Sequence, residues 1–256
     1  MLSAELTFAI LENYDPSDDE AFEDLLSIWY KNGQIETKRW HTVRNNQHVR
    51  VTAWLPDENA LDAVHNNTYA NEVLTDLPKR GFGLPVIRIL GVDTQFDPPC
   101  SCPNSESLIL ITNYLSAISP FRCGSCFNPV ALYRLPHTHD EEHLDVLHWA
   151  SDYRACDTLQ MHCTTGERFA ESQLYRYDSS LSQQGKDIAA KLSTKIFKPV
   201  YYFLLKSRGK SLNSERSRHC PSCGGTWLLE QPWHGLFDFR CDRCSLLSNI
   251  ACGIQK

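Results

Sequence analysis

The sequence has no apolar run long enough to cross a membrane, because none approaches the ~18 apolar residues that a spanning helix needs. Its start, MLSAELTFAILENYD, lacks the positively charged segment of a secretion signal, and Glu5 interrupts the apolar stretch. These absences predict a cytoplasmic protein without a membrane partner.

Common enzyme motifs are missing as well: there is no P-loop, no Gly-x-Ser-x-Gly, no His-Glu-x-x-His and no dinucleotide glycine cluster. One stretch, LPHTHDEEHLDVLHW, leaves an enzymatic function possible. On a helix, His139 and His143 would share a face near Asp140 and could bind a metal or transfer protons. The alternative is a helix N-terminus with solvated histidines, where Asp140, Glu141 and Glu142 favour the positive end of the dipole. No catalytic residue is therefore predicted.

Positive charge is scarce in most of the chain. Residues 1–185 hold 13 Lys/Arg against 26 Asp/Glu, a balance of −13, whereas residues 186–256 hold 12 against 5, a balance of +7. An acidic body with a basic end predicts that the end contacts phosphate. The alternative is that the two parts neutralise each other by docking.

Cysteine, by contrast, is abundant, with eleven residues. In a reducing cytosol this number indicates metal binding rather than disulfides. Eight of the cysteines fall into two groups of four. The remaining three, Cys156, Cys163 and Cys252, are expected to be small buried apolar residues.

The C-terminal group lies in RHCPSCGGTW…FDFRCDRCSLL, where Cys220-x-x-Cys223 and Cys241-x-x-Cys244 are separated by seventeen residues. Four thiolates close a tetrahedral zinc shell and leave no position for water, so the zinc is predicted to be structural. A thioredoxin-type redox motif would instead use one pair beside a βαβ unit. The intervening segment divides into two short strands around 232–235, which together predict a zinc ribbon.

The first group is less regular and consists of Cys100, Cys102, Cys123 and Cys126. Its second pair is an ordinary knuckle. The Cys-x-Cys pair can reach one metal only on a bent loop, a bend that Pro99 and Pro103 can supply. A second structural zinc is therefore predicted, and the alternative is two loose thiols beside an isolated knuckle.

The first ninety residues show alternating strand and helix patterns. AELTFAILE alternates as a strand. SDDEAFEDLLSIWYKNG predicts a helix with a capping box of Ser17 and Glu20 and an end at Gly33. IETKRWHTV and HVRVTAWLP predict a hairpin that turns at Asn45-Asn46. DENALDAVHNNTYANEVLTDL predicts a second helix, and LPVIRILGV a fourth strand. This βαββαβ order is typical of the ferredoxin-like fold.

One face of this sheet carries Arg39, Arg50 and Trp54, which could contact RNA as in RNA-recognition modules. The chain lacks the glycine- and aromatic-rich third-strand signature of those modules, so a sheet face covered by the next domain is favoured.

The later residues are helical and then basic. DEEHLDVLHWASDYRA, GERFAESQLYRY and SSLSQQGKDIAAKLSTKIF predict helices, PVYYFLLK a buried strand and SRGKSLNSERSR a linker. The predicted fold class is α+β with four parts: a ferredoxin-like domain at 1–95, the first cysteine cluster at 96–137, a helical segment ending in a strand at 138–205, and a basic linker with the zinc ribbon at 206–256.

Both cysteine clusters, together with SPFRCGSCFNPVALYRLP, PVYYFLLK and CPSCGGTW…FDFRCDRCSLLSNIA, resemble a family of uncharacterised bacterial zinc-ribbon proteins described as nucleic-acid-binding. The resemblance covers nearly the whole chain. It implies the eight cysteine ligands named above and no catalytic residue.

Three functions remain open at this stage. The first is binding of nucleic acid, RNA or single strands, through the basic C-terminal end. The candidate contacts are Lys206, Arg208, Lys210, Arg216, Arg218, Trp233, Arg240 and Arg243. Trp227 and Phe239 are expected in the core of the ribbon and Trp233 is expected to be freer. The second function is a protein-docking adaptor of a larger cytoplasmic machine, and the third is a metal-dependent enzyme using His139 and His143. The oligomeric state is left open.

Overall fold

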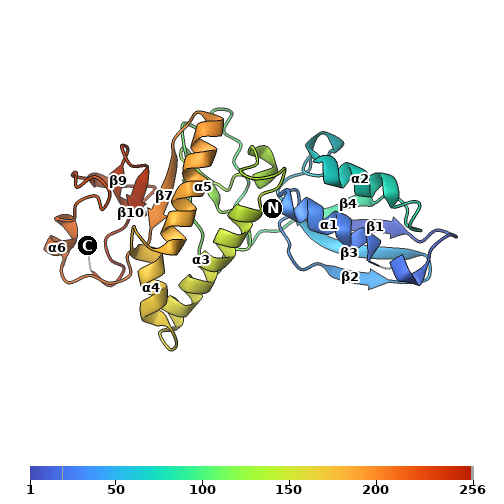
Figure 1. Cartoon of the computed structure of the whole chain (residues 1–256), viewed down its shortest axis with the longest axis horizontal. Coiled ribbons are helices and arrows are strands. Elements are labelled where there is room, and N and C mark those ends of the chain that lie inside the picture. The colour runs from blue at the N-terminus through green and yellow to red at the C-terminus, as the bar shows by residue number, and fades with distance from the viewer. Residues whose placement is uncertain (19, 255–256) are drawn as a thin grey trace. The chain divides into compact units, whose positions relative to one another are not determined.

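The computed structural model describes residues 1–18 and 20–254 (Figure 1). The chain divides into two compact units. Unit 1 comprises Met1–Pro99, Ala117–Ser119 and Asn128–Leu144. Unit 2 comprises Cys100–Ser116, Pro120–Phe127 and the chain from Asp145 onward. The segment 96–137, which the sequence treats as one part, therefore contributes to both units.

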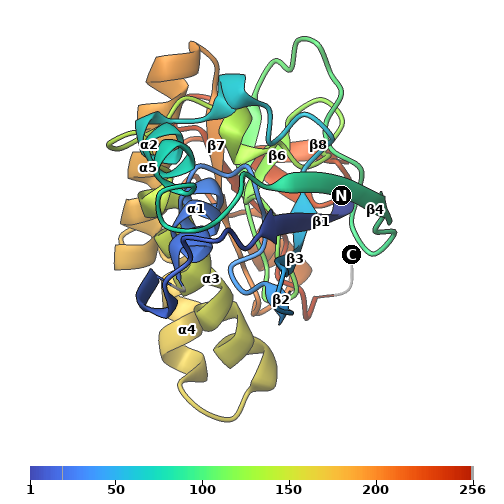
Figure 2. The same cartoon turned by 90° about the vertical axis from the view of Figure 1, so that its right-hand side faces the viewer.

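Unit 1 contains a four-stranded antiparallel sheet with the strand order β2-β3-β1-β4. Helices α1 and α2 lie on one face of this sheet (Figure 2). The elements are β1 (Leu2–Ala9), α1 (Ala21–Lys31), β2 (His41–Arg44), β3 (His48–Leu55), α2 (Thr68–Asp76) and β4 (Val86–Val92), with 3-10 turns at Pro16–Asp18, Ala63–His65 and Leu132–Arg134. The predicted order of strands and helices is confirmed.

Helix α1 follows the expected pattern on its apolar side and at its end. Its stripe of Phe22, Leu25, Leu26 and Trp29 is buried. The helix ends at Gly33, whose φ of 75° is left-handed. The amide of Gly33 donates to the carbonyl of Tyr30 at 3.0 Å and that of Gln34 to Trp29 at 2.8 Å, a pattern that satisfies the last carbonyls.

Three details of unit 1 differ from expectation. The capping box is wrong, because Glu20 makes no side-chain cap and Ser17 lies in the preceding turn, where its amide donates to Asp15. The second helix begins only at Thr68, because Asn67 caps it by accepting the amide of Ala70 at 2.9 Å. The first hairpin strand begins at His41 rather than near residue 35.

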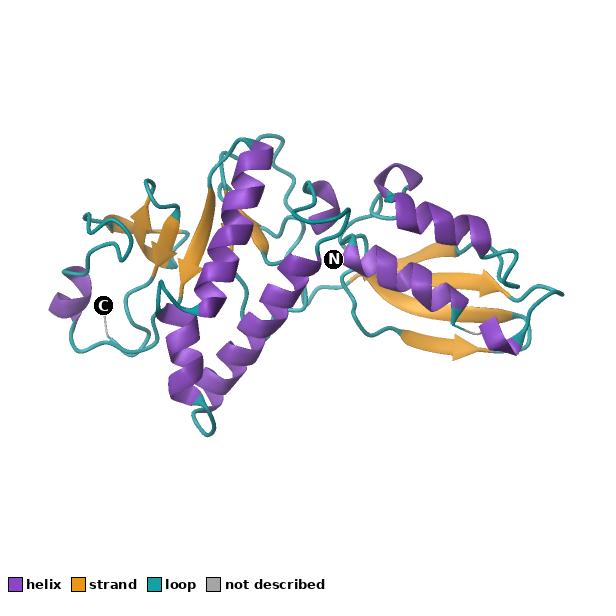
Figure 3. Cartoon of the chain, in the orientation of Figure 1, coloured by secondary structure: helices purple, strands orange, loops and turns teal. Residues whose placement is uncertain are grey.

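Unit 2 contains a six-stranded mixed sheet with the order β6-β5-β7-β10-β9-β8 (Figure 3). Its strands are β5 (Leu108–Leu110), β6 (Phe121–Cys123), β7 (Val200–Leu204), β8 (Leu228–Trp233), β9 (Phe237–Cys241) and β10 (Leu246–Ser248). β7 runs parallel to β5 and to β10, and every residue of β7 is buried. One sheet therefore takes strands from all three of the later sequence segments.

Three of the four helices that follow unit 1 in sequence were expected: α3 (Leu144–His162), α4 (Glu167–Tyr175) and α5 (Ser180–Ile196). α5 packs against β7 at Gly185, where a Cβ would lie 2.1 Å from a ring carbon of Tyr202. A short fourth helix, α6 (Leu212–Arg216), lies in the segment expected to be a linker. Within residues 1–18 and 20–254, no helix is both long and apolar enough to cross a membrane.

Candidate metal centres

The C-terminal group of cysteines forms one cluster in unit 2. The sulfurs of Cys220, Cys223, Cys241 and Cys244 all lie within 4.8 Å of one another. The first two cysteines occupy a turn before β8, and the other two follow from the end of β9 into the turn before β10. In the first turn the amide of Gly224, which has a left-handed φ of 69°, donates to the carbonyl of Cys220 at 2.9 Å. Each turn thus delivers two sulfurs to one point.

The first group of cysteines forms a second cluster of the same kind, with its four sulfurs also within 4.8 Å of one another. Cys123 ends β6, and the sulfurs of Cys100 and Cys126 are 3.6 Å apart. The amide of Cys102 donates to the sulfur of Cys100 at 3.4 Å. The Cys-x-Cys pair therefore does reach the group, and the four sulfurs are positioned to bind a metal ion.

Each cluster contains one thiol whose pKa is lowered. The amide of Gly225 lowers the pKa of Cys223 to about 7. Burial raises the pKa of Cys123, but hydrogen bonds from Ser105 and from backbone amides outweigh this and lower it to about 6. Burial raises the pKa of Cys100 and Cys241 to about 12. In each group one thiol therefore ionises more readily than a free cysteine, and a bound cation would have to displace protons from the thiols whose pKa is raised.

The three other cysteines behave differently from one another. Cys156 is buried in α3, as expected. Cys163 and Cys252 are exposed, so the expectation that they are buried apolar residues is wrong for these two. Both lie outside regular elements, Cys163 just after α3 and Cys252 near the end of the described chain, where little covers a side chain.

The histidine stretch does not form the expected helical pair. α3 begins at Leu144, after both residues, and Asp140 and Glu141 have positive φ angles of 28° and 55°. His139 is exposed beside the carboxylate of Asp140, whereas His143 is 1% exposed. The left-handed backbone separates the two side chains, so a shared helix face is wrong, and so is the alternative of two solvated histidines.

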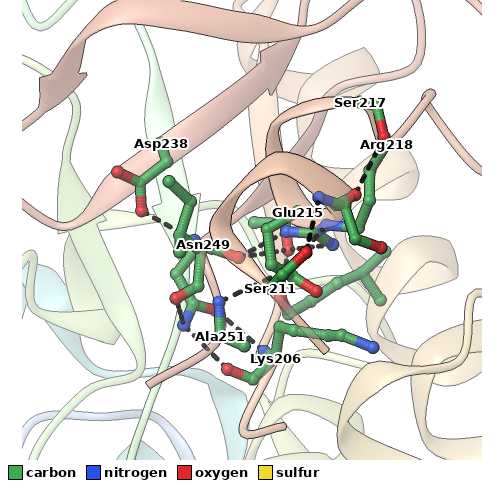
Figure 4. A network of polar contacts seen from close by, with 12 residues as sticks. Lys206, Ser211, Glu215, Ser217, Arg218, Asp238, Asn249 and Ala251 are labelled. Carbon is green, nitrogen blue, oxygen red and sulfur yellow. Dashed lines mark hydrogen bonds and ion pairs between the residues drawn. The ribbon is translucent and has the colours of Figure 1, made fainter. Parts of the chain in front are cut away.

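Arg218, one of the expected phosphate contacts, is used inside the protein. Its Nε lies 3.0 Å from a carboxylate oxygen of the buried Glu215, and its Nη2 donates to the carbonyl of Asn249 at 2.5 Å (Figure 4). Its guanidinium carbon sits 4.2 Å from the centre of the Phe239 ring. The charge is thus neutralised and largely covered, which leaves Arg218 poorly placed to contact a ligand.

Figure 4 also shows a polar network around this pair that the sequence did not reveal. Asn249 exchanges two hydrogen bonds with the backbone of Lys206, at 2.8 and 2.9 Å. The buried Asp238 accepts the amide of Ile250 at 2.7 Å. These contacts join residues 249–251 to α6, to the segment that follows β7 and to β9. The only sequence signal is the spacing of Glu215 and Arg218, three apart, as in a helical ion pair.

Arg240 and Trp233 are likewise engaged. Arg240 donates to Asp242 at 2.5 Å and to the hydroxyl of Tyr201 at 2.8 Å, and its guanidinium covers the Trp233 ring at 4.6 Å. Trp233 is half-buried, with its ring 5.5 Å from that of Tyr201. Trp227 and Phe239 are buried, as expected. Trp233 is more exposed than these two but forms part of the hairpin's own packing.

The remaining basic candidates separate into paired and unpaired residues. Arg208 forms an ion pair with Glu167, and the amine of Lys206 lies 3.7 Å from the centre of the Tyr175 ring. Lys210, Arg216 and Arg243 are exposed, and no ion pair within residues 1–18 and 20–254 involves them. These three side chains are the ones best placed to contact a ligand.

Comparisons with known proteins match most of the chain. Three families match, each described as a "Domain of unknown function": DUF8589 over residues 1–91, DUF2310 over 102–205 and DUF8594 over 209–253. An uncharacterized protein of Haemophilus influenzae is 30% identical over 247 residues, which cover 94% of each chain. A second uncharacterized protein of that species is 32% identical over 164 residues, 64% of this chain and 81% of its own. No solved structure matches.

Proposed function

We propose a function for a chain that belongs to the same family as the Haemophilus influenzae protein matched over 94% of both sequences. This chain is proposed to be a zinc-stabilised protein that binds single-stranded nucleic acid through its basic C-terminal end. It is proposed to prefer RNA to duplex DNA. Its N-terminal unit is of the ferredoxin-like type and its C-terminal cysteine hairpin is a zinc ribbon.

The donor sets support zinc as the metal. Each cluster offers four cysteine sulfurs, and thiolates select soft or borderline ions such as zinc. Four protein ligands leave no position for water, which supports a structural rather than a catalytic role. The fold names rest on topology: the strand order β2-β3-β1-β4 with two helices supports the first, and two knuckles flanking the β8–β9 hairpin support the second.

The observation that carries the nucleic-acid proposal is the exposure of Lys210, Arg216 and Arg243 on the basic part of the chain. Residues 186–256 carry a side-chain balance of +7, and a zinc ion with four thiolates adds about −2, which leaves about +5. This charge supports a weak, sequence-tolerant grip on phosphate. The acidic remainder of the chain disfavours duplex DNA, whose charge density is high.

A salt titration of binding to a single-stranded oligonucleotide tests this proposal. In the variant with Lys210, Arg216 and Arg243 changed to Ala, the slope of log affinity against log salt should become shallower by about 2–3. A matched control removes three exposed cations of unit 1, Lys38, Lys79 and Arg88, and should keep the wild-type slope. Absence of binding at low salt, or an unchanged slope in the first variant, would refute the proposal.

The second candidate function, a protein-docking adaptor, is favoured by the β4 strand. β4 is an edge strand, and its apolar side chains are exposed, with Val86 at 68% and Val92 at 70%. An apolar, unprotected edge is a template for pairing with another chain. Changing Val86 and Val92 to Lys should abolish any stable complex made through this edge and leave nucleic-acid binding unchanged.

The geometry of His139 and His143 gives no support to the third candidate function, a metal-dependent enzyme.

A further inference from the structure

Unit 2 contains a groove beside the first knuckle of the C-terminal metal centre. It is a cavity of about 490 Å³ between the turn that joins α4 to α5 and the residues leading into Cys220. Its lining residues include Tyr175, Tyr177 and Trp227 and the exposed Arg176, His219 and Pro221. We propose that this groove, named here the stacking groove, holds one unpaired nucleobase of a single strand. The proposal rests on the nucleic-acid function above and names the site where a base is held.

The aromatic walls of the stacking groove are held in place before any ligand arrives. The amine of Lys186 lies 3.1 Å from the centre of the Tyr177 ring and donates to the carbonyl of Tyr177 at 2.8 Å. The Tyr177 hydroxyl accepts a hydrogen bond from Ser222 at 3.2 Å. Fixed rings lose little conformational freedom on binding, so stacking energy is retained as affinity.

The floor of the groove is equally fixed and links it to the ribbon. The indole nitrogen of Trp227 donates to the carbonyl of Arg218 at 3.1 Å, and its ring packs 5.2 Å from that of Phe239. Trp227 is 4% exposed, so only a small part of it borders the cavity. A volume of this size suits a small planar ligand.

The charges around the stacking groove favour a neutral ring over an ion. Arg176 is paired with Asp178 at 2.7 Å and Arg218 with Glu215 at 3.0 Å. The nearby cations Lys186 and Lys206 each lie over one face of a tyrosine ring, and their charge disfavours a cationic ligand. A zinc centre with four thiolates adds about −2, which offsets these two lysines. With the local charge close to balance, binding in the groove should come from base stacking and depend little on salt.

The test uses the full, zinc-loaded chain and two fluorescent twelve-nucleotide strands, one of uridylate and one of the same ribose-phosphate backbone without bases. The wild type should bind the uridylate strand about tenfold or more tightly than the abasic strand. This ratio should stay constant between 50 and 200 mM salt, roughly the range over which phosphate contacts weaken.

Tyr177→Leu should reduce the ratio to about one while affinity for the abasic strand stays unchanged. Tyr177→Phe keeps the ring and should retain the ratio. The matched control is Phe169→Leu, an exposed aromatic residue of α4 outside the groove. Should Tyr177→Leu lose zinc, ultraviolet cross-linking of the uridylate strand to the wild type replaces it, with attachment expected at Tyr175 or Tyr177.

Each other outcome overturns the inference in a distinct way. Equal binding of both strands by the wild type, or an unchanged ratio in Tyr177→Leu, refutes the stacking groove and leaves the nucleic-acid function standing. Failure to bind either strand refutes both. Binding of a peptide rich in Tyr and Glu that Tyr177→Leu abolishes, without base-dependent binding, would assign the groove to a protein partner.

Discussion

The two units of this chain differ in their cysteine content and in the length of their strands. Unit 1 contains none of the eleven cysteines and encloses an extensive apolar cluster around Phe8, Leu25 and Trp29. Unit 2 contains all eleven, and three of its six strands are only three residues long. Such short strands gain little from pairing alone, so we expect an ion bound at each four-cysteine group to supply much of the order at the ends of the sheet. Metal removal should therefore act on one unit and spare the other.

The largest expected effect is that of Cys241→Ser, which removes one sulfur from the C-terminal centre. Structural zinc contributes roughly 10–16 kcal/mol of apparent binding energy, so residues 220–248 should lose protection in hydrogen exchange. Unit 1 should keep its protection. The exposed Cys252 serves as the control, and Cys252→Ser should change neither unit. Equal loss of protection in both units would contradict the comparison.

A smaller effect within unit 2 is expected from its buried ion pair. Arg218→Ala leaves the carboxylate of Glu215 buried without its partner, which costs about 3–5 kcal/mol of unfolding free energy. The exposed Arg216 on α6 is the matched control, and Arg216→Ala should stay within about 0.5 kcal/mol of wild type. Urea unfolding followed by tryptophan fluorescence measures both. A similar loss of unfolding free energy in the two variants would show that the buried ion pair does not stabilise unit 2 more than an exposed arginine does.

The stability of unit 1 is expected to depend on the packing of its apolar core and not on metal binding. Leu25 is fully buried in α1, so Leu25→Ala should lower the unfolding free energy of unit 1 by about 2–5 kcal/mol. Zinc content should stay at the wild-type value. Loss of zinc in this variant would mean that the two units unfold together, against the comparison drawn above.

The parts of this fold that sequence predicts well are those set by local spacing. The apolar stripe of Phe22, Leu25 and Trp29 predicts α1, because it depends on residues close in the chain. The two Cys-x-x-Cys pairs predict the C-terminal cysteine group for the same reason. Both are confirmed. The joining of β5, β7 and β10 into one sheet depends on pairings between residues 92 apart (Leu108 with Val200) and 44 apart (Tyr202 with Leu246), which periodicity does not contain.

Two of the incorrect predictions have local causes, and a third depends on residues distant in the chain. Apolar spacing alone predicts that the second helix begins about ten residues earlier, whereas Asn67 caps it and it begins at Thr68. Left-handed backbone at Asp140 and Glu141 broke the expected pairing of His139 with His143. The sequence predicts a phosphate contact at Arg218 because it is basic and lies near a knuckle, whereas its burial depends on Glu215 from α6 and on Phe239 from β9. Charge read from sequence does not tell which charges are already neutralised.

The smallest expected effect is a pH signal from the thiols. The pKa values of Cys100, Cys102, Cys220 and Cys241 are raised, so zinc binding near neutral pH should release about two or more protons per ion. As the pH falls, protons compete with the cation for the thiols, so metal-derived stability should be lost towards acid pH. An indicator dye in weak buffer measures the protons. Zinc uptake without proton release would contradict sulfur ligation.

The most direct test of the account is the zinc content of the protein purified without chelator. Both four-cysteine groups are positioned to bind an ion, so elemental analysis should give about two zinc ions per chain. Zero or one zinc ion per chain would contradict the claim that unit 2 is held together by two structural metal centres.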